Sequence, residues 1–125
     1  MGITHRFDNN MLLLEFPSLY TTEEMRTAVS AAIADPTFAE GMNMLVDARA
    51  SQVFPSLQEM SARMSLLISL SRYIGKNCAI VVSNQKHYHN SLILSDGIRK
   101  EGLYLRVFDD FDVAKTWLIS LANTP

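Results

Sequence analysis

Apolar residues recur with two different periods along this chain, and segments of the two kinds alternate. Short apolar runs at 3–7 and 11–16 flank Asp8-Asn9-Asn10, a turn-forming cluster, and predict an antiparallel hairpin. Further short apolar runs are typical of buried strands. The longer segments between them have the 3.6-residue spacing of helices that bury one face. After the hairpin, the expected elements are helices at 21–34, 56–74, 87–101 and from 109 onward, and strands at 44–46, 78–82 and 103–108.

Three of the predicted helices begin with a recognisable signal. A polar residue is followed three positions later by an acid at Thr21, Ser56 and Asp109. In this arrangement the first side chain accepts a hydrogen bond from the third backbone amide of the helix, and the acid reaches back to the first amide. Gly75 lies where the long helix should end and is suited to a left-handed stop.

Strands that alternate with helices require crossover connections, which are nearly always right-handed. The sequence therefore predicts a single α/β domain over 1–125, with a mostly parallel sheet and an antiparallel hairpin at its edge. The chain has 125 residues, and its 48% apolar content is sufficient for one core. On the last helix, Val113, Trp117 and Leu121 are expected to share one face.

Charge and cysteine content narrow the class of protein. The net charge is −2 with both signs spread along the chain, so neither a nucleic-acid groove nor a polybasic membrane patch is indicated. No apolar run approaches the roughly 18 residues of a membrane span, and no leader-like segment opens the chain. Cys78 is the only cysteine, which excludes an intrachain disulfide and suits a reducing compartment. We expect a cytoplasmic protein in which Cys78 is a buried apolar residue.

Several local strings, in this order of elements, resemble the STAS-like superfamily, whose namesake is the bacterial anti-sigma-factor antagonist SpoIIAA. The strings are N-M-L-V-D-A-R at 43–49, A-I-V-V-S at 79–83 and L-R-V-F-D-D-F-D-V-A-K-T-W-L at 105–118. With the hairpin they cover nearly the whole chain, which looks like the divergent bacterial branch of stand-alone proteins. The resemblance implies a right-handed β-α superhelix of about five strands and four helices, the architecture shared with lipid-carrying CRAL-TRIO domains. It also implies a non-enzymatic protein-interaction or regulatory module.

The chain departs from the switch-type members of that superfamily at their regulatory site. Those proteins place a phosphorylatable serine in an Asp-Ser-Ser-Gly-like turn after the third strand. Here the stretch from Asp47 to Glu59 is D-A-R-A-S-Q-V-F-P-S-L-Q-E, which lacks that turn. Ser56 lies in roughly the right place, and Ser51 is a poorer candidate phosphosite or anion site. We favour a helix-capping role for Ser56.

The long helix carries more apolar surface than one sheet contact requires. Its broader stripe is expected to pack on the sheet, which leaves a second flank made of Leu66, Leu70 and Tyr73. We hypothesise that this flank is an interaction surface, in a homodimer or with a protein partner not identified by the sequence. The alternative is simple burial under a neighbouring helix. The broader stripe consists of Leu57, Met60, Met64, Leu67, Ile68 and Ile74.

Met60 and Met64 suggest a second function. Flexible thioethers suit pockets that accept varied ligands, so these two residues are candidates to face a small apolar ligand or a lipid. Core filling is the more frequent use of methionine. A carrier or sensor of such a ligand is therefore the alternative to the interaction module.

Enzymatic and metal-dependent functions receive less support. His87 and His89 would diverge on a helix, and no cysteine or acid beside them completes a zinc set, so we expect no metal and no cofactor. Asp47, Arg49 and Ser83 could converge with His87 at one end of the sheet and form a small hydrolase site. Capping and ion pairing are the more ordinary roles of these side chains, so we expect no enzyme.

Overall fold

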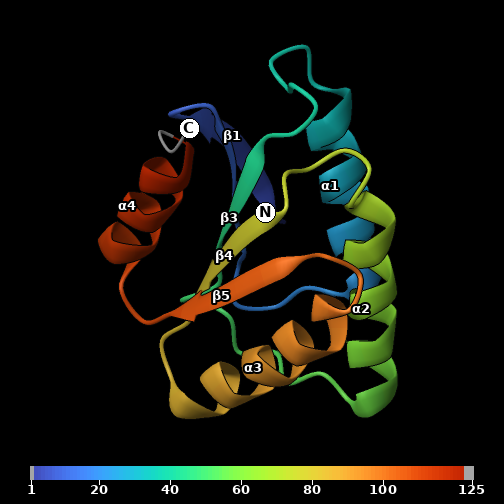
Figure 1. Cartoon of the computed structure of the whole chain (residues 1–125). Coiled ribbons are helices and arrows are strands. Elements are labelled where there is room, and N and C mark those ends of the chain that lie inside the picture. Colours follow the sequence, from blue (N-terminus) through green and yellow to red (C-terminus); the bar gives the residue numbers. More distant parts are fainter. Residues whose placement is uncertain (1, 123–125) are drawn as a thin grey trace.

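The computed structural model describes residues 2–122, which form one five-stranded sheet and four helices (Figure 1). The strands follow the sheet in the order β1-β2-β3-β4-β5, and only the β1–β2 pair is antiparallel. The predicted α/β class, edge hairpin and sequential strand order are thereby confirmed. The elements are β1 (Thr4–Asp8), β2 (Met11–Glu15), α1 (Thr22–Ala34), β3 (Asn43–Asp47), α2 (Leu57–Leu70), β4 (Asn77–Val81), α3 (Gln85–Arg99), β5 (Tyr104–Phe108) and α4 (Phe111–Ala122).

The hairpin turn explains how the sheet begins. Asn9 and Asn10 both have positive φ angles, 51° and 60°. A two-residue loop with two left-handed residues is a type I′ turn, whose twist matches that of the paired strands, and asparagine tolerates this conformation well. The turn fixes the register in which Asp8 pairs with Met11.

The helices are divided unevenly between the two faces of the sheet. Along β2, Leu12 and Leu14 belong to one core cluster, and Met11 and Leu13 belong to the other. The first cluster contains buried residues of α1, α2 and α3, whereas α4 alone covers the second face. Figure 1 shows α4 on one side of the sheet and α1 and α2 on the other. The three-helix side is the thicker part of the core.

The expected helix caps at Thr21 and Ser56 are confirmed, each as a reciprocal capping box with the acid three residues later. The third cap lies one residue later than expected. Asp110, not Asp109, accepts a hydrogen bond from the backbone amide of Val113, at 3.1 Å. At α3, Asn84 caps the helix, so that it begins two residues before the predicted position.

The expected orientation of α2 is wrong. Leu66 and Leu70 are only 5% and 7% exposed and lie in the core cluster, while Leu57, which was expected to face the sheet, is 85% exposed. The whole helix is therefore rotated relative to the prediction. Tyr73 lies beyond the end of the helix and is 38% exposed. An interaction surface made of Leu66 and Leu70 is not present on the exterior of this chain.

The expected end of the long helix is also wrong. The long helix ends at Leu70, four residues early, and Gly75 has no left-handed backbone. A Cβ atom on Gly75 would lie 2.7 Å from the carbonyl oxygen of Gly41 and closer still to the side-chain oxygen of Asn43, so glycine is needed for close approach. On α4, Val113 is exposed, and the buried positions are Ala114 and Leu118.

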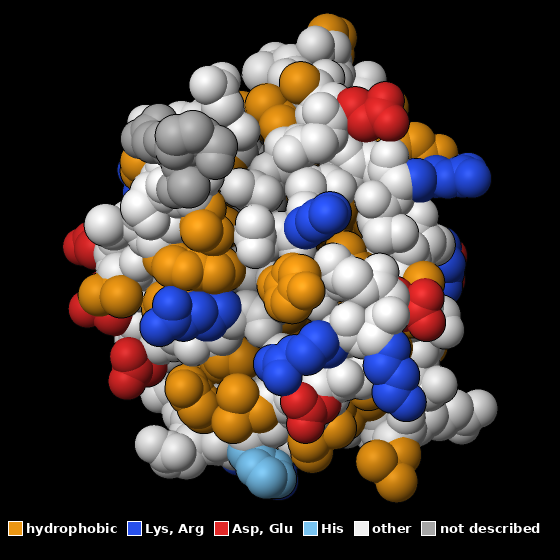
Figure 2. Space-filling model, viewed as in Figure 1, with side chains coloured by type: hydrophobic (Ala, Val, Ile, Leu, Met, Phe, Trp, Pro, Cys, Tyr) orange, Lys and Arg blue, Asp and Glu red, His pale blue; other side chains and the backbone are white. Residues whose placement is uncertain are grey.

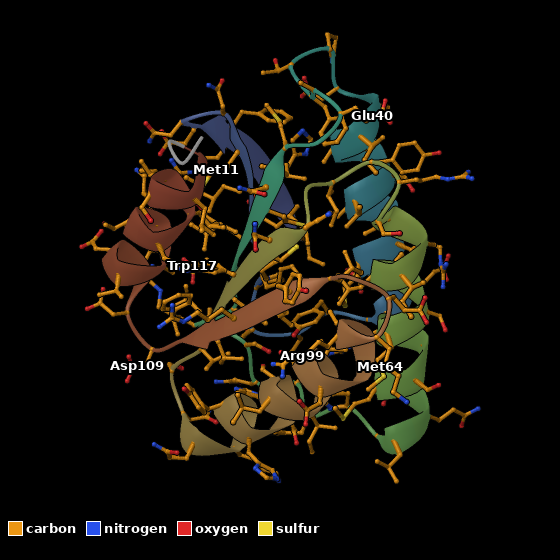
Figure 3. All side chains as sticks on the ribbon, viewed as in Figure 1. Met11, Glu40, Met64, Arg99, Asp109 and Trp117 are labelled. Carbon is orange, nitrogen blue, oxygen red and sulfur yellow. The ribbon has the colours of Figure 1, made fainter. Side chains whose placement is uncertain are left out.

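The two outer strands are both short and bear charged side chains. On β5, the guanidinium of Arg106 lies 5.0 Å from the ring centroid of Phe108 and 5.5 Å from that of Trp117. Trp117 belongs to α4 (Figure 3). Across the hairpin, Arg6 pairs with Glu15 at 3.3 Å. Figure 2 shows acidic, basic and apolar side chains interspersed on the face viewed, in keeping with the small net charge.

The orientation of α2 predicts a sharp difference between two leucines. Leu66→Ala should lower the free energy of unfolding by about 2–5 kcal/mol, because it removes buried apolar volume. Leu57→Ala should change it by less than about 0.5 kcal/mol, because that side chain is exposed. Urea unfolding followed by circular dichroism measures both variants. Equal losses, or a larger loss at Leu57, would contradict the observed orientation.

Candidate functional site

A cavity of about 100 Å³ lies between the three-helix face of the sheet and the helices that cover it. Its walls are almost entirely apolar, and every element of that side of the core contributes to them. The cavity therefore lies largely within this side of the core, and it is partly open to solvent. Representative lining residues are Leu14, Val29, Met44, Val46, Met60, Leu66, Leu70, Val82, Leu94 and Leu105.

The loop between β3 and α2, residues 48–56, closes one end of the cavity through Val53 and Pro55. Two tethers hold it to the segment that precedes α1. The hydroxyls of Ser51 and Tyr20 share a hydrogen bond of 2.9 Å, and the Gln52 amide donates to the Ser18 carbonyl at 2.8 Å. The loop has no regular secondary structure, so these contacts determine its position.

A third tether comes from His87 in the first turn of α3, where the ring is only 6% exposed. Asn84 accepts from the His87 amide through its side-chain oxygen, so its NH₂ group faces Nδ1 of the ring at 3.0 Å. Nδ1 must then accept, and Nε2–H donates to the Val53 carbonyl at 2.9 Å. Phe54 stacks on the same ring at 4.3 Å. His87 thus holds loop 48–56 in place through its hydrogen bond to Val53 and its stacking with Phe54.

Arg63 is the most unusual residue of the cavity wall. It lies in the middle of α2, is 9% exposed, and its Nε and one terminal nitrogen have no hydrogen-bond partner within the protein. The guanidinium lies 5.4 Å from the ring centroid of Tyr20, a cation–π contact that compensates only part of the lost hydration. An unsatisfied buried polar group costs about 1–3 kcal/mol, and a charged one costs more.

The nearest acid along the helix forms no ion pair with Arg63. Glu59 lies one turn earlier, but its carboxylate accepts from the Ser56 amide at 3.1 Å as part of the capping box. That backbone hydrogen bond holds the pKa of Glu59 below its usual value. Among residues 2–122, no carboxylate forms an ion pair with Arg63.

The sequence did not lead us to Arg63, although a signal was present. Arg63 precedes Leu66, Leu67 and Leu70 by three, four and seven positions, and therefore shares their face of the helix. The stripe expected to face the sheet was centred on Met60 and Met64, and it did not include position 63. A lone arginine within an apolar helical stripe would have identified it.

The other candidate site residues have separate positions. Met60 lines the cavity, whereas Met64 points to Gly97, where α2 and α3 approach closely (Figure 3). Ser56 uses its hydroxyl in the α2 cap. Ser51 is buried at the base of loop 48–56, so a modifying enzyme could reach it only if the loop opened.

The suggested hydrolase residues are each held by a structural partner. Arg49 donates to both carboxylate oxygens of Asp47 at 2.9 and 2.8 Å, and Ser83 donates to the Arg49 carbonyl at 2.7 Å. His87 is engaged with Asn84 and Val53, as described above. No hydrogen bond joins the Asp47, Ser83 and His87 side chains, all of which are described.

A second, open depression lies at the carboxyl ends of β4 and β5 and measures about 480 Å³. Ser83, Asn84, Arg106 and Asp109 contribute polar groups to it. It holds no buried polar side chain that lacks a partner, as far as residues 2–122 show. The apolar cavity that Arg63 lines is therefore the stronger candidate for a specific site.

The remaining features of interest are the thiol of Cys78, possible metal ligands and possible membrane-spanning helices. Burial raises the pKa of Cys78 to about 12, so its thiol stays protonated, as expected for a buried apolar residue. Within residues 2–122, no three histidine, cysteine or acidic side chains gather as metal ligands. In the same range, no helix combines the length and apolarity needed to cross a membrane.

The fold is similar to that of an uncharacterized protein of the DUF3478 family from Shewanella loihica PV-4, which is described as having a SpoIIAA-like fold. The two chains are 17% identical, with a TM-score of 0.62 over 94% of this chain and 92% of the other. This likeness establishes a SpoIIAA-like fold and confirms the expected resemblance at that level. No family model matches the sequence, and no curated protein matches it.

The Asp47–Arg49 pair predicts a defined dependence of stability on pH. The hydrogen bonds from Arg49 hold the pKa of Asp47 below its ordinary value of 3.8. Because the folded-state pKa is the lower one, the contribution of the pair is complete above that ordinary value and is lost as the pH falls through the folded-state pKa. In Arg49→Met, the loss of unfolding free energy between about pH 6 and about pH 3 should be smaller than in the parent chain.

Arg72→Met is the matched control. The guanidinium of Arg72 lies beside the Tyr73 ring, and its side chain is exposed. Its pH dependence should equal that of the parent chain. Denaturant unfolding at a series of pH values measures all three proteins, and identical slopes for Arg49→Met and the parent would refute the role of the pair.

Proposed function

We propose that this SpoIIAA-like domain is a non-enzymatic binding module of the STAS-like regulatory type, and that it acts by enclosing a small apolar ligand. The observation that carries the proposal is the cavity between the sheet and helices α1, α2 and α3. Well-packed interiors contain few spaces larger than a water molecule, because each void forfeits dispersion contacts. A cavity with apolar walls and a closing loop is the usual form of a small-ligand site.

The volume restricts the class of ligand. An apolar cavity of about 150 Å³ is known to hold benzene. A space of about 100 Å³ is therefore in the range of one aromatic ring or a short branched chain. A long acyl chain would need a much larger enclosure, so this proposal concerns a compact ligand and not a membrane lipid.

Loop 48–56 connects the cavity to the surface of the protein, so that ligand binding in the cavity would alter that surface. Its residues Val53 and Pro55 line the cavity, while Phe54 between them is 46% exposed. Leu57, at the start of α2, is also exposed. A ligand that displaces the cavity-facing residues must also displace Phe54, because the chain is continuous.

A protein partner is the second candidate function, and this exposed segment is the observation that favours it. Phe54 and Leu57 replace the flank first expected from Leu66 and Leu70, which is enclosed within the subunit. A partner that contacts Phe54 and Leu57 would be sensitive to the state of loop 48–56. Ligand binding and partner binding are then two parts of one regulatory function.

The non-enzymatic character is supported by how the polar side chains are used. Asp47, Arg49, Ser83 and His87 each stabilise local structure, and their side chains do not form a nucleophile–base pair. Hydrolysis needs a nucleophile and base within hydrogen-bond reach and a position for the reacting carbonyl between them.

The proposal predicts that benzyl alcohol, a small neutral aromatic probe, binds inside the domain. In ¹H–¹⁵N NMR titrations, shifts should concentrate at cavity residues such as Ala48 and Leu94 and spread through loop 48–56. The α4 side of the sheet should be unaffected, because it is separated from the cavity by the strands. Hydrogen exchange in loop 48–56 should change with occupancy.

Ala48→Leu and Ala50→Leu form a matched pair for this test. Ala48 is buried in the cavity wall, so the larger side chain should occupy the space and abolish the shifts. Ala50 is exposed two residues later, and its variant should bind normally. If the parent chain shows no saturable shifts at cavity residues, or if both variants bind equally well, the cavity is not a ligand site.

A further inference from the structure

The buried guanidinium of Arg63 points to the chemistry of the ligand. Arginine remains charged in proteins, so burial cannot be relieved by loss of a proton. Its Nε and one terminal nitrogen are buried and have no acceptor within the protein, and the Arg63 side chain lines the cavity. Two neighbouring donors of one planar fork therefore lack an acceptor beside the cavity.

The lining of the cavity beside Arg63 contains no compensating negative charge. Of the residues that line the cavity, none is an aspartate or a glutamate, and Arg63 is the sole lysine or arginine. The polar groups contributed by the other elements are the hydroxyls of Tyr20, Ser51 and Ser91, the amide of Asn90 and the ring of His87. The cavity thus presents one fixed positive charge among apolar walls.

We propose that the cavity binds a compact apolar carboxylate, with the carboxylate on the Arg63 guanidinium and the apolar part among the leucines. This inference rests on the proposed function and adds the class of ligand. A carboxylate matches the guanidinium fork in shape and in charge, and the match is strongest where water is excluded. A phosphate dianion would bring a second negative charge that no other lysine or arginine of the lining could balance.

Tyr20 and Ser51 explain why the guanidinium stays in place. The Tyr20 ring contacts Arg63, and the Tyr20 hydroxyl is tied to Ser51 in loop 48–56. The aromatic ring thus orients the charge while leaving its donors free. It also links the anion-binding group to the loop that closes the cavity.

The test compares benzoate with benzamide, which has the same shape but no charge. NMR titration of the full chain should show benzoate binding roughly ten- to a hundredfold more tightly than benzamide. In Arg63→Met this preference should disappear, while benzamide still binds. Without ligand, Arg63→Met should be at least as stable as the parent, because an apolar side chain replaces an uncompensated charge.

Arg72→Met, which removes an exposed arginine, should retain the preference for benzoate. Arg63→Lys should bind benzoate more weakly than the parent, because the point charge lacks the planar fork. Inorganic phosphate serves as the competing probe and should not displace benzoate.

Each contrary result overturns a defined statement. Equal binding of benzoate and benzamide to the parent would refute the carboxylate inference and leave the cavity as a ligand site. Displacement of benzoate by phosphate would also refute the inference. A large loss of stability in Arg63→Met, with loss of benzamide binding, would make Arg63 a purely structural residue. If neither aromatic compound shifts the cavity residues, the proposed function itself fails.

Discussion

The burial of Leu66 and Leu70 in the core cluster of the three-helix side is the interaction on which the site depends. These leucines fix the rotation of α2 about its own axis, and an α-helix cannot turn one side chain inward without turning its neighbours at three, four and seven positions. Arg63 is such a neighbour. The apolar contact that stabilises the fold therefore carries a charged group into the interior, where the three-helix side leaves a space beside it.

Much of the fold was predictable because local chemistry specifies it. Asn9 and Asn10 allow a type I′ turn, Thr21 and Ser56 close the first turns of their helices, and alternating elements leave few topologies. These signals act over three or four residues, so a single sequence displays them. The division into strands and helices follows from such signals, whereas the order of the strands was implied by the resemblance to the STAS-like superfamily.

The failures arose where non-local packing decides between similar patterns. The helix α2 has two apolar flanks, and its sequence alone does not say which one meets the sheet. The role of Gly75 depends on Gly41 and Asn43, which lie far from it along the chain. Arg63 was missed for the same reason, since its significance exists only once the orientation of the helix is known. The cavity has no sequence signal, because it results from imperfect filling between three helices.

The charged side chains on the two edge strands, β1 and β5, affect how this molecule associates with others. A strand at the border of a sheet exposes unpaired amides and carbonyls, which invite an incoming chain to extend the sheet. Here the edge strands β1 and β5 are five residues long. Arg6 on β1 forms an ion pair with Glu15, and the guanidinium of Arg106 on β5 lies against aromatic rings. Covering either margin would strip hydration from those cations, so β-augmentation and amyloid-type stacking are disfavoured and recognition is left to side-chain surfaces.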